Sequence, residues 1–423
     1  MERLQNQMVT WRRDFHKHPE LGFLEMRTAS IVAEQLEGLG FEIQLGREVM
    51  HPDFCMGKPD EKATAAHFEW AKRHGAVEKY LQHFEEGYTG VVGILDTGTP
   101  GPTVAFRVDM DALPVYESET DNHFPNRNHF RSINENMHAC GHDVHTTIGL
   151  GLAAMLSEHK DELRGRIKLI FQPAEEGVRG ARSMVEAGVA DDVDYFIASH
   201  IGLNVPFNHF IASNNGFLAS SKIDVSFKGV ASHAGGHPEE GKNAMLAAAS
   251  AVLNLHSIPR HADGATRINV GEIHAGSGRN IIPDSAELKV EIRGATTELN
   301  EYMKSYAEKV IEGAAIMHQV DYDITLAGEA ISAKGSPELA AIMHKSAEKA
   351  GLNSELENNS AAGSEDATYF MEAVQKSGGY ATYCIFGTDL AAGHHNEKFD
   401  VNEDSMMSSA RVLFEAAKTL THE

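Results

Sequence analysis

The stretch TVAFRVDMD, residues 103–111, is a short apolar run that ends in acidic residues. Three later runs have the same form: RIKLIFQPAEE at 166–176, DYFIASH at 194–200 and YATYCIFGT at 380–388. Helical patterns such as TTIGLGLAAMLSEH separate them, which is typical of parallel strands covered by helices on both faces. We therefore expect an α/β fold with its chemistry beyond the carboxyl ends of these strands, where five polar residues lie: Asp109, Asp111, Glu175, Glu176 and His200.

A different order of predicted strands and helices begins near residue 218. KIDVSFKG alternates like a half-buried strand, NAMLAAASAVLNLHSI is helical, and RINVGEI and SAELKVEIR are strands. A long helical pattern from 298 to 320 and the strand DYDITL complete the order β-α-β-β-α-β, which is that of ferredoxin-like α+β domains. We expect this domain to span residues 218–327, inserted as a lid or dimerisation module into a discontinuous domain of residues 1–217 and 328–423.

Between these patterns and the N-terminus, residues 46–87 form a charged segment, GREVMHPDFCMGKPDEKATAAHFEWAKRHGAVEKYLQHFEEG. Its only regular pattern predicts one helix over about residues 63–84. We interpret the segment as an insertion outside the core.

Composition excludes several classes of protein. The chain has 423 residues, enough for two cores, and a formal net charge of -24, which argues against nucleic acid as a partner. The first residues, MERLQNQMVTWRRDF, lack the apolar region of a signal peptide, and the apolar run from Ile148 is too short to span a membrane. Three widely spaced cysteines form no disulfide framework. A cytoplasmic location fits best.

Four separated segments share one chemical theme: HACGHDVH at 138–145, PAEEG at 173–177, SH at 199–200 and AAGHHNEKFD at 391–400. Each alone has an ordinary explanation, since paired glutamates are usually a solvated surface and paired histidines occur in many loops. Together they supply thiolate, imidazole and carboxylate donors suited to transition metals. The set is large enough for two divalent ions: Cys140, His142, Glu176, His200 and His395.

Glu175 stands beside the predicted ligand Glu176. A carboxylate in that position can accept a proton from a water without binding metal itself. Divalent ions can lower the pKa of a bound water from 15.7 to about 7, and a general base typically contributes about 10²–10⁴-fold in rate. The combination indicates hydrolysis of an amide.

The motifs RVDMDALP, HACGHD, PAEEG, SH, SHAG at 232–235 and GHHNEKFD occur in the order found in the M20 metallopeptidase family, and the chain resembles its amidohydrolase branch along nearly its whole length. The resemblance implies a zinc-peptidase-like catalytic domain, a mixed sheet flanked by helices, with a lid or dimerisation domain inserted. The segment 46–87, with GSGRNIIP and GSEDAT, is similar to branch members that act on p-aminobenzoyl-glutamate.

Residue roles follow from this resemblance. Cys140, His142, Glu176, His200 and His395 match the metal ligands of the branch, with His394 as second choice to His395, and Glu175 matches the general base. Asp111 matches the aspartate that orients a ligating imidazole. Asp109 departs from the wider family, which has a histidine ligand there, and a capped strand end explains it equally well. GSEDA at 363–367 is expected to support the site or to cap a helix.

The resemblance also implies roles for the inserted domain. His233, in SHAG, matches a histidine that reaches the active site of the partner in family dimers, where it can stabilise an oxyanion. Asn269, Arg279 and Asn280 are candidates for binding substrate carboxylates, for which a guanidinium offers two parallel hydrogen bonds. Such local cations and metal ions would overcome the negative charge of the chain.

The leading function is thus metal-dependent hydrolysis of an N-acyl amino acid, foremost p-aminobenzoyl-glutamate to p-aminobenzoate and glutamate. Acetyl, benzoyl or indole-acyl conjugates are alternative substrates. A third possibility is a non-catalytic partner subunit of a heteromer. The presence of Glu175 argues against it, because a non-catalytic homologue would be expected to lose its general base. The cysteine favours Zn²⁺ and the remaining ligands also suit Mn²⁺, which the resemblance implies. A homodimer or a heteromer with a related subunit is expected.

Overall fold

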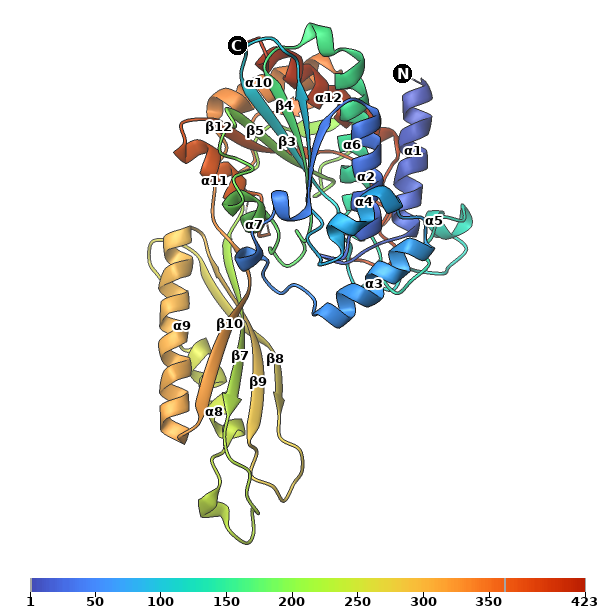
Figure 1. Ribbon diagram of the computed structural model, residues 1–423. Helices are drawn as coiled ribbons and strands as arrows, with labels where there is room; N and C mark the ends of the chain where they lie inside the picture. The colour runs from blue at the N-terminus through green and yellow to red at the C-terminus, as the bar shows by residue number, and fades with distance from the viewer. Residues whose placement is uncertain (1, 361–362, 423) are drawn as a thin grey trace. The chain divides into compact units, whose positions relative to one another are not determined.

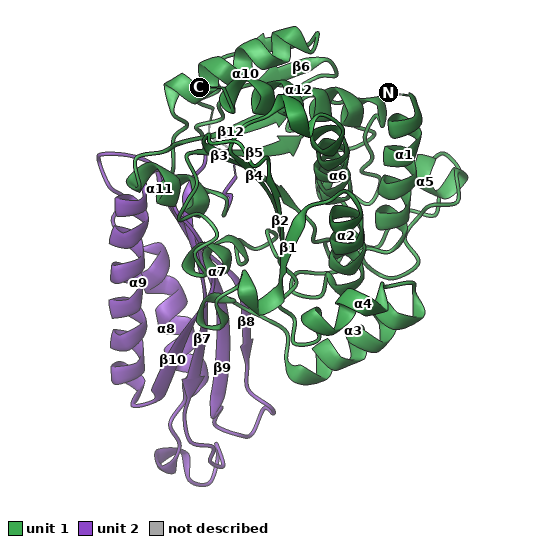
Figure 2. Cartoon of the chain, turned by 45° about the horizontal axis from the view of Figure 1, so that its top comes forward, with its two compact units in different colours: residues 1–216, 333–360, 366–423 green, residues 217–332, 361–365 purple. Residues whose placement is uncertain are grey.

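The computed structural model describes residues 2–360 and 363–422, which form two compact units (Figure 2). Unit 1 comprises residues 2–216, 333–360 and 366–422. Unit 2 comprises Phe217–Ser332 together with residues 363–365. The first unit is discontinuous because the second is inserted into it.

A mixed sheet forms the centre of unit 1 (Figure 1). Its strands have the order β1-β2-β4-β3-β5-β12-β6-β11. β3 pairs in parallel with β4 and β5, and β12 pairs in parallel with β5, which confirms the arrangement predicted from the four apolar runs. β2 is antiparallel to both β1 and β4, so the sheet is mixed. The strands are β1 (Glu42–Leu45), β2 (Val91–Asp96), β3 (Thr103–Asp109), β4 (Arg166–Gln172), β5 (Tyr195–Ile201), β6 (His209–Ile211), β11 (Asn353–Glu355) and β12 (Tyr380–Phe386).

Helices cover both faces of this sheet (Figure 1). One layer contains α1 (Glu2–Lys17), α2 (Met26–Gly38), α6 (His142–Glu158), α10 (Pro337–Lys349) and α12 (Asp404–Leu420), and the other contains α7 (Ala181–Glu186) and α11 (Thr368–Lys376). Shorter elements are η1 (Gly46–Glu48), η2 (Pro52–Phe54), α3 (Glu61–Arg73), α4 (Glu78–Leu81), η3 (Gln82–Phe84), α5 (Phe124–Arg127) and η4 (Lys160–Glu162).

Two covered faces explain why the strand sequences are mostly apolar and do not alternate. Every residue of β3 is buried, so there is no solvent face to carry alternating polar side chains. α6 packs unusually close to the strands, because a side chain at Gly149 would lie 2.9 Å from Phe171 and Val108. This close contact fixes the N-terminus of α6, which carries the HACGHD motif, above the carboxyl end of the sheet.

The segment 46–87 differs from its prediction in two ways. The single helix expected over 63–84 is interrupted after α3, where Gly75 adopts a φ of +90° that favours glycine. The segment is also part of the core, since Ala71, Tyr80, Leu81 and Phe84 are buried in the main apolar cluster. The expectation that it lies outside the core was wrong, because the few apolar residues of a charged segment are enough to anchor it.

Unit 2 is an antiparallel sheet with the order β10-β7-β9-β8, packed against α8 and α9. This order and the connection β-α-β-β-α-β confirm the ferredoxin-like prediction. Asn243 and Thr296 cap α8 and α9 through their side chains, as their positions before the helical patterns suggest. The elements are β7 (Ala219–Lys228), η5 (Pro238–Glu240), α8 (Ala244–His256), β8 (Thr266–Ala275), β9 (Ser285–Gly294), α9 (Thr297–His318) and β10 (Asp321–Ala330).

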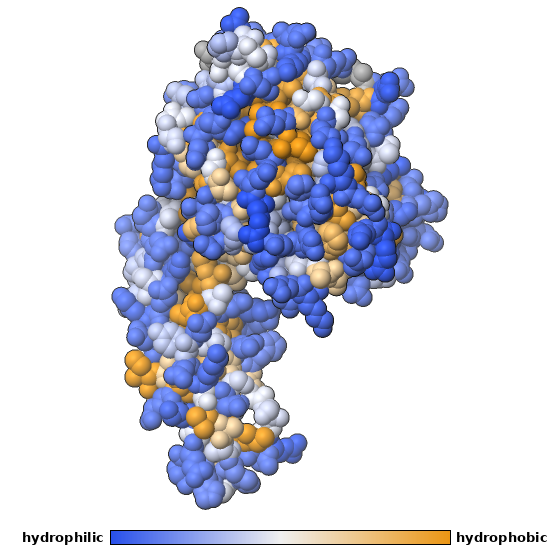
Figure 3. Space-filling view, viewed as in Figure 1, coloured by the Kyte–Doolittle hydropathy of each residue, from blue (hydrophilic) through white to orange (hydrophobic). Residues whose placement is uncertain are grey.

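Hydrophilic side chains cover most of the face seen in Figure 3, as the charge of the chain leads one to expect. Within the described residues, no helix has the length and apolarity needed to cross a membrane.

Candidate metal centre

The register of the central strands brings the predicted site residues of unit 1 to one edge of the sheet. β3 and β4 pair Asp109 with Gln172, and β3 and β5 pair Arg107 with Ala198. The residues that follow β3 and β4 therefore leave the sheet side by side, and they include Asp111, Glu175 and Glu176. His200 lies within β5 near the same end of the sheet, where it pairs with Ile385 of β12.

The turn before α6 delivers two further predicted ligands to this edge. Gly141 has a φ of +91°, and a side chain there would lie 2.7 Å from Ile201, so only glycine fits. Cys140 precedes this glycine and His142 begins the helix. The Cys140 Sγ lies 3.4 Å from Nε2 of His200. Potential ligand atoms of Cys140, His142 and Glu176 lie within 4.8 Å of one another.

Asp111 connects the histidine to the paired glutamates. Its Oδ1 lies 3.2 Å from Nδ1 of His142 and also accepts the backbone N–H of Glu175 at 3.0 Å. Its Oδ2 accepts the N–H of Glu176 at 2.9 Å. One buried carboxylate thus directs Nε2 of His142 into the site and fixes the backbone of both glutamates. These contacts are those an orienting aspartate requires.

Two atoms of the set are suited to receive a cation. Among the residues that the structure describes, Nε2 of His142 and Oε1 of Glu176 are buried and lack a hydrogen-bond partner. A buried polar atom without a partner costs about 1–3 kcal/mol, and a bound divalent ion would remove that cost. The donor set therefore fits a metal centre.

His200 presents a defined nitrogen. Its Nδ1–H donates to the backbone O of Ile201 at 2.7 Å, so the lone pair remains on Nε2, which faces Cys140. Burial, and then the charge of neighbouring histidines, lowers the pKa of His200 well below its ordinary value. Burial, and then the charge of Glu176, raises the pKa of the Cys140 thiol well above its ordinary value. Metal binding must therefore displace the thiol proton.

The structure places both tandem histidines near these donors. Nε2 of His395 lies 3.5 Å from Oε1 of Glu176, and Nδ1 of His394 lies 3.8 Å from Sγ of Cys140. The backbone N–H of His395 donates to the O of Ala139 at 2.7 Å, which ties this loop to the HACGHD turn.

Glu175 is 8% exposed, and its Oε2 lies 3.9 Å from Nε2 of His142. The preceding residue, Ala174, adopts a left-handed φ of +52°, which is strained for a residue other than glycine. Glu25 supports this strained turn, since its Oε1 accepts the N–H of Ala174 at 2.8 Å and its Oε2 accepts the hydroxyl of Thr89 at 2.6 Å. Glu25 was not predicted from the sequence. It precedes α2, far along the chain from Ala174, and no sequence pattern indicates a contact between the two residues.

His145 is a second site residue that was not predicted, although it stands in the HACGHDVH motif. Its Nδ1 lies 2.6 Å from Oδ1 of Asp109, and its Nε2 accepts the N–H of Ile201 at 2.9 Å. Both ring nitrogens are thus occupied by protein groups, although His145 lies close enough to His142 and His200 to form a potential ligand group. The i, i+3 spacing from His142 was the available signal.

Asp366, in GSEDA, accepts the N–H groups of Gly180 and Ala181 at 3.0 and 2.9 Å, where α7 begins. Its other oxygen accepts from Gln172 at 2.8 Å and lies 3.2 Å from Arg107. The motif thus caps a helix and joins it to the central strands, which was one of its two expected roles.

The other predicted residues lie in unit 2. His233 is exposed, and its Nδ1 accepts the N–H groups of Gly235 at 3.1 Å and Gly236 at 2.9 Å. The neutral ring therefore carries its proton on Nε2, where it can be donated.

A turn of unit 2 lies beside His233. The N–H of Ala234 donates to the backbone O of Asn280 at 3.0 Å. Arg279 and Asn280 are exposed in this turn, and Asn269 is exposed on β8. All three candidates for substrate binding thus present side chains to solvent within unit 2.

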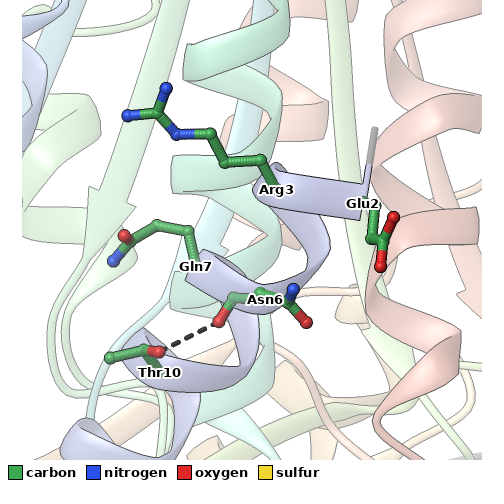
Figure 4. A pocket seen from close by; sticks show the side chains of 5 residues that line it. All are labelled: Glu2, Arg3, Asn6, Gln7 and Thr10. Carbon is green, nitrogen blue, oxygen red and sulfur yellow. Dashed lines mark hydrogen bonds between the residues drawn. The ribbon is translucent and has the colours of Figure 1, made fainter.

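A hollow of about 470 Å³ on α1 is a separate feature (Figure 4). In it, the hydroxyl of Thr10 donates to the backbone O of Asn6 at 2.9 Å. The described residues that line it, Glu2, Arg3, Asn6, Gln7 and Thr10, include none of the predicted ligands.

The mixed sheet with candidate metal-binding donors at one end of its strands and the inserted α+β domain agree with the following comparisons, which identify the chain as a hydrolase acting on amide bonds. Residues 105–419 match peptidase family M20/M25/M40, and the chain belongs to this family.

Relatives of known name cover almost the full length. The chain is 51% identical over 410 residues to the A subunit of p-aminobenzoyl-glutamate hydrolase from Escherichia coli (strain K12), covering 96% of this chain and 94% of that one. It is equally 51% identical over 410 residues to indole-3-acetyl-aspartic acid hydrolase of Enterobacter agglomerans, with the same coverage. A crystal structure of the aminobenzoyl-glutamate utilization protein from Klebsiella pneumoniae, 45% identical, superposes with a TM-score of 0.86 over 99% of this chain and 96% of that one.

Proposed function

We propose that the chain is a two-metal amidohydrolase that cleaves N-acyl amino acids, with p-aminobenzoyl-glutamate as its substrate and p-aminobenzoate and glutamate as products. The observation that carries this proposal is the arrangement around Asp111. One carboxylate holds a candidate ligand, His142, and the adjacent pair Glu175 and Glu176. The relatives with names that specify this substrate support the choice of acyl group.

Five residues would hold the two ions: Cys140, His142, Glu176, His200 and His395. When bound, divalent ions polarise the scissile carbonyl and make a water nucleophilic at neutral pH. We assign Mn²⁺ or Zn²⁺, since imidazole and carboxylate suit both and the thiolate favours the softer Zn²⁺.

Glu175 then serves as general base. It takes a proton from a water in the site, and it returns a proton to the amine of the departing amino acid. The hydrogen bond from its backbone to Asp111 keeps it beside the ligands. Since the backbone of Glu176 is held by the same carboxylate, base and ligand keep a fixed separation.

Unit 2 supplies the other groups of the proposed reaction. The Nε2–H of His233 donates to the oxyanion that forms at the carbonyl. Arg279, Asn269 and Asn280 bind the carboxylates of the amino-acid half. The chain acts as a homodimer, in which His233 serves the site of a second copy, or as a heteromer with a related subunit, as the name of one relative suggests. Its three cysteines are free, which supports a reducing cytoplasm as the location.

Indole-3-acetyl-aspartate is the second candidate substrate, because a hydrolase of that name shares equal identity with the chain. Both substrates place an aromatic acyl group on an acidic amino acid, so the same carboxylate-binding groups suit both.

A substrate panel tests the proposal. Purified protein, loaded with Mn²⁺ or Zn²⁺ and assayed alone and together with a candidate second subunit, is given p-aminobenzoyl-glutamate, indole-3-acetyl-aspartate and hippurate. We expect the highest kcat/KM for p-aminobenzoyl-glutamate and loss of activity on chelation. Preference for the indole conjugate would select the second candidate, and no hydrolysis of any conjugate would refute catalysis.

A further inference from the structure

The tandem histidines His394 and His395 raise a question that the metal centre leaves open. Both side chains lie near candidate ligands, and one of them contacts sulfur rather than carboxylate. The hydrogen bonds made by the side chain of His394 bear on this question.

The backbone N–H of Leu203 donates to Nε2 of His394 at 3.1 Å. The lone pair of Nε2 is therefore engaged by a protein donor. In a neutral imidazole the proton must then lie on the other nitrogen, Nδ1. That nitrogen lies 3.8 Å from Sγ of Cys140, within the range of an N–H···S hydrogen bond.

Packing holds the ring of His394 in this orientation. It lies against Gly202, where a side chain would approach Nε2 to 2.9 Å. Its centroid is 5.2 Å from that of the His200 ring, with the two planes nearly perpendicular, and 4.9 Å from that of Phe399. A ring flip would place a carbon against the Leu203 N–H and leave that donor without its acceptor.

We propose that His394 is a positioning residue that donates a hydrogen bond from Nδ1 to the Cys140 thiolate, and that His395 is the metal ligand of the pair. The proposal rests on the proposed two-metal function and extends it. An N–H donor withdraws electron density from the thiolate and fixes the direction of its lone pairs. Partners of this kind commonly change metal affinity by about 10–100-fold when removed.

Two conservative variants separate the two nitrogens of His394. The amide nitrogen of asparagine lies where Nδ1 of histidine lies, so His394→Asn keeps the donor to sulfur. The amide of glutamine reaches the position of Nε2, so His394→Gln keeps a partner for the Leu203 N–H and loses the donor to sulfur. The matched control is His395→Gln at the adjacent position, and Cys140→Ser identifies signals that belong to this sulfur.

The full-length protein is loaded with Co²⁺, and the ions are counted by elemental analysis. The sulfur-to-cobalt charge-transfer band is recorded in the near ultraviolet, and Co²⁺ affinity is measured by chelator competition. We expect His394→Gln to retain two ions, to move the band to longer wavelength, and to bind Co²⁺ about 10-fold more weakly. His394→Asn should resemble wild type in all three, and His395→Gln should lose one ion.

Loss of one ion from His394→Gln with two retained by His395→Gln would overturn the proposal, since His394 would then be the ligand. Two ions with an unmoved band in His394→Gln would also overturn it, since the sulfur would not sense the ring. These readouts involve no substrate. Failure of the substrate panel with the expected cobalt spectra would reject the proposed reaction alone, and the reverse result would reject only the role of His394.

Discussion

Replacement of Asp111 by asparagine tests how the candidate metal centre is held together. The carboxylate is 1% exposed and accepts the backbone N–H groups of Glu175 and Glu176 with separate oxygens. Asparagine offers one acceptor oxygen, so its NH₂ must face one of these N–H donors. A hydrogen bond to a charged group contributes about 1.5–3 kcal/mol, and we expect the metal-free Asp111→Asn variant to lose about this much stability.

Metal binding should weaken as well, because the same oxygen that accepts from Glu175 also orients His142. Loss of an orienting partner typically lowers metal affinity about 10–100-fold, or by about 1.4–2.7 kcal/mol. Chelator competition with Zn²⁺ and Mn²⁺ gives the affinity, and urea unfolding of the metal-free protein gives the stability. Wild-type values in both assays would refute the reasoning, because Asp111 would then hold neither the histidine nor the glutamate backbone.

Three further predictions concern other parts of the chain. Burial alone would lower the pKa of His16, but contacts with Glu117 and Asp143 raise it to about 9. The protonated ring therefore stabilises the fold below pH 6.5 and loses this contribution as pH rises toward 9. Each pKa unit corresponds to about 1.4 kcal/mol. In urea unfolding, His16→Gln should therefore be about 3 kcal/mol less stable than wild type at pH 6, and the difference should be smaller at pH 9.5. An equal loss of stability at the two pH values would contradict this role of the protonated ring. His233→Ala should lower kcat by about 100-fold or more. Its melting temperature should stay unchanged, because the side chain is exposed. Wild-type kinetics would show that His233 takes no part in catalysis. Phe171→Ala, at a fully buried position, should cost about 3–5 kcal/mol in thermal unfolding, and a loss under about 1 kcal/mol would mean that the core closes around the gap.

The parts of the fold that sequence could predict are those in which one pattern has one physical cause. A run such as TVAFRVD lacks a regular polar and apolar alternation because both faces of β3 are covered. Ile223, Val225 and Phe227 alternate with more exposed residues because β7 has one covered face. The structure of segment 46–87 was not predicted correctly from such patterns. Gly75 interrupts the expected helix, and a few buried side chains such as Phe84 attach the segment to the core.

The candidate site was predictable to the extent that its residues follow strand ends or stand in short motifs. Cys140, His142 and Glu176 were predicted as ligands in this way, and their potential donor atoms lie within 4.8 Å of one another. Glu25 could not be predicted, because its side chain acts through one backbone N–H, that of Ala174, in a distant loop. His145 stands in the same motif as two candidate ligands, and only its hydrogen bonds show that both of its ring nitrogens already contact protein groups.

Replacement of the proposed general base, Glu175, with the candidate metal ligands intact, tests the central claim most directly. Glu175→Gln keeps the size of the side chain and the backbone hydrogen bond to Asp111. With p-aminobenzoyl-glutamate as substrate, we predict that kcat falls by about 10²–10⁴-fold, while elemental analysis still finds the wild-type amount of metal. Wild-type turnover, or loss of a metal ion from this variant, would contradict the assignment of Glu175 as base and Glu176 as ligand.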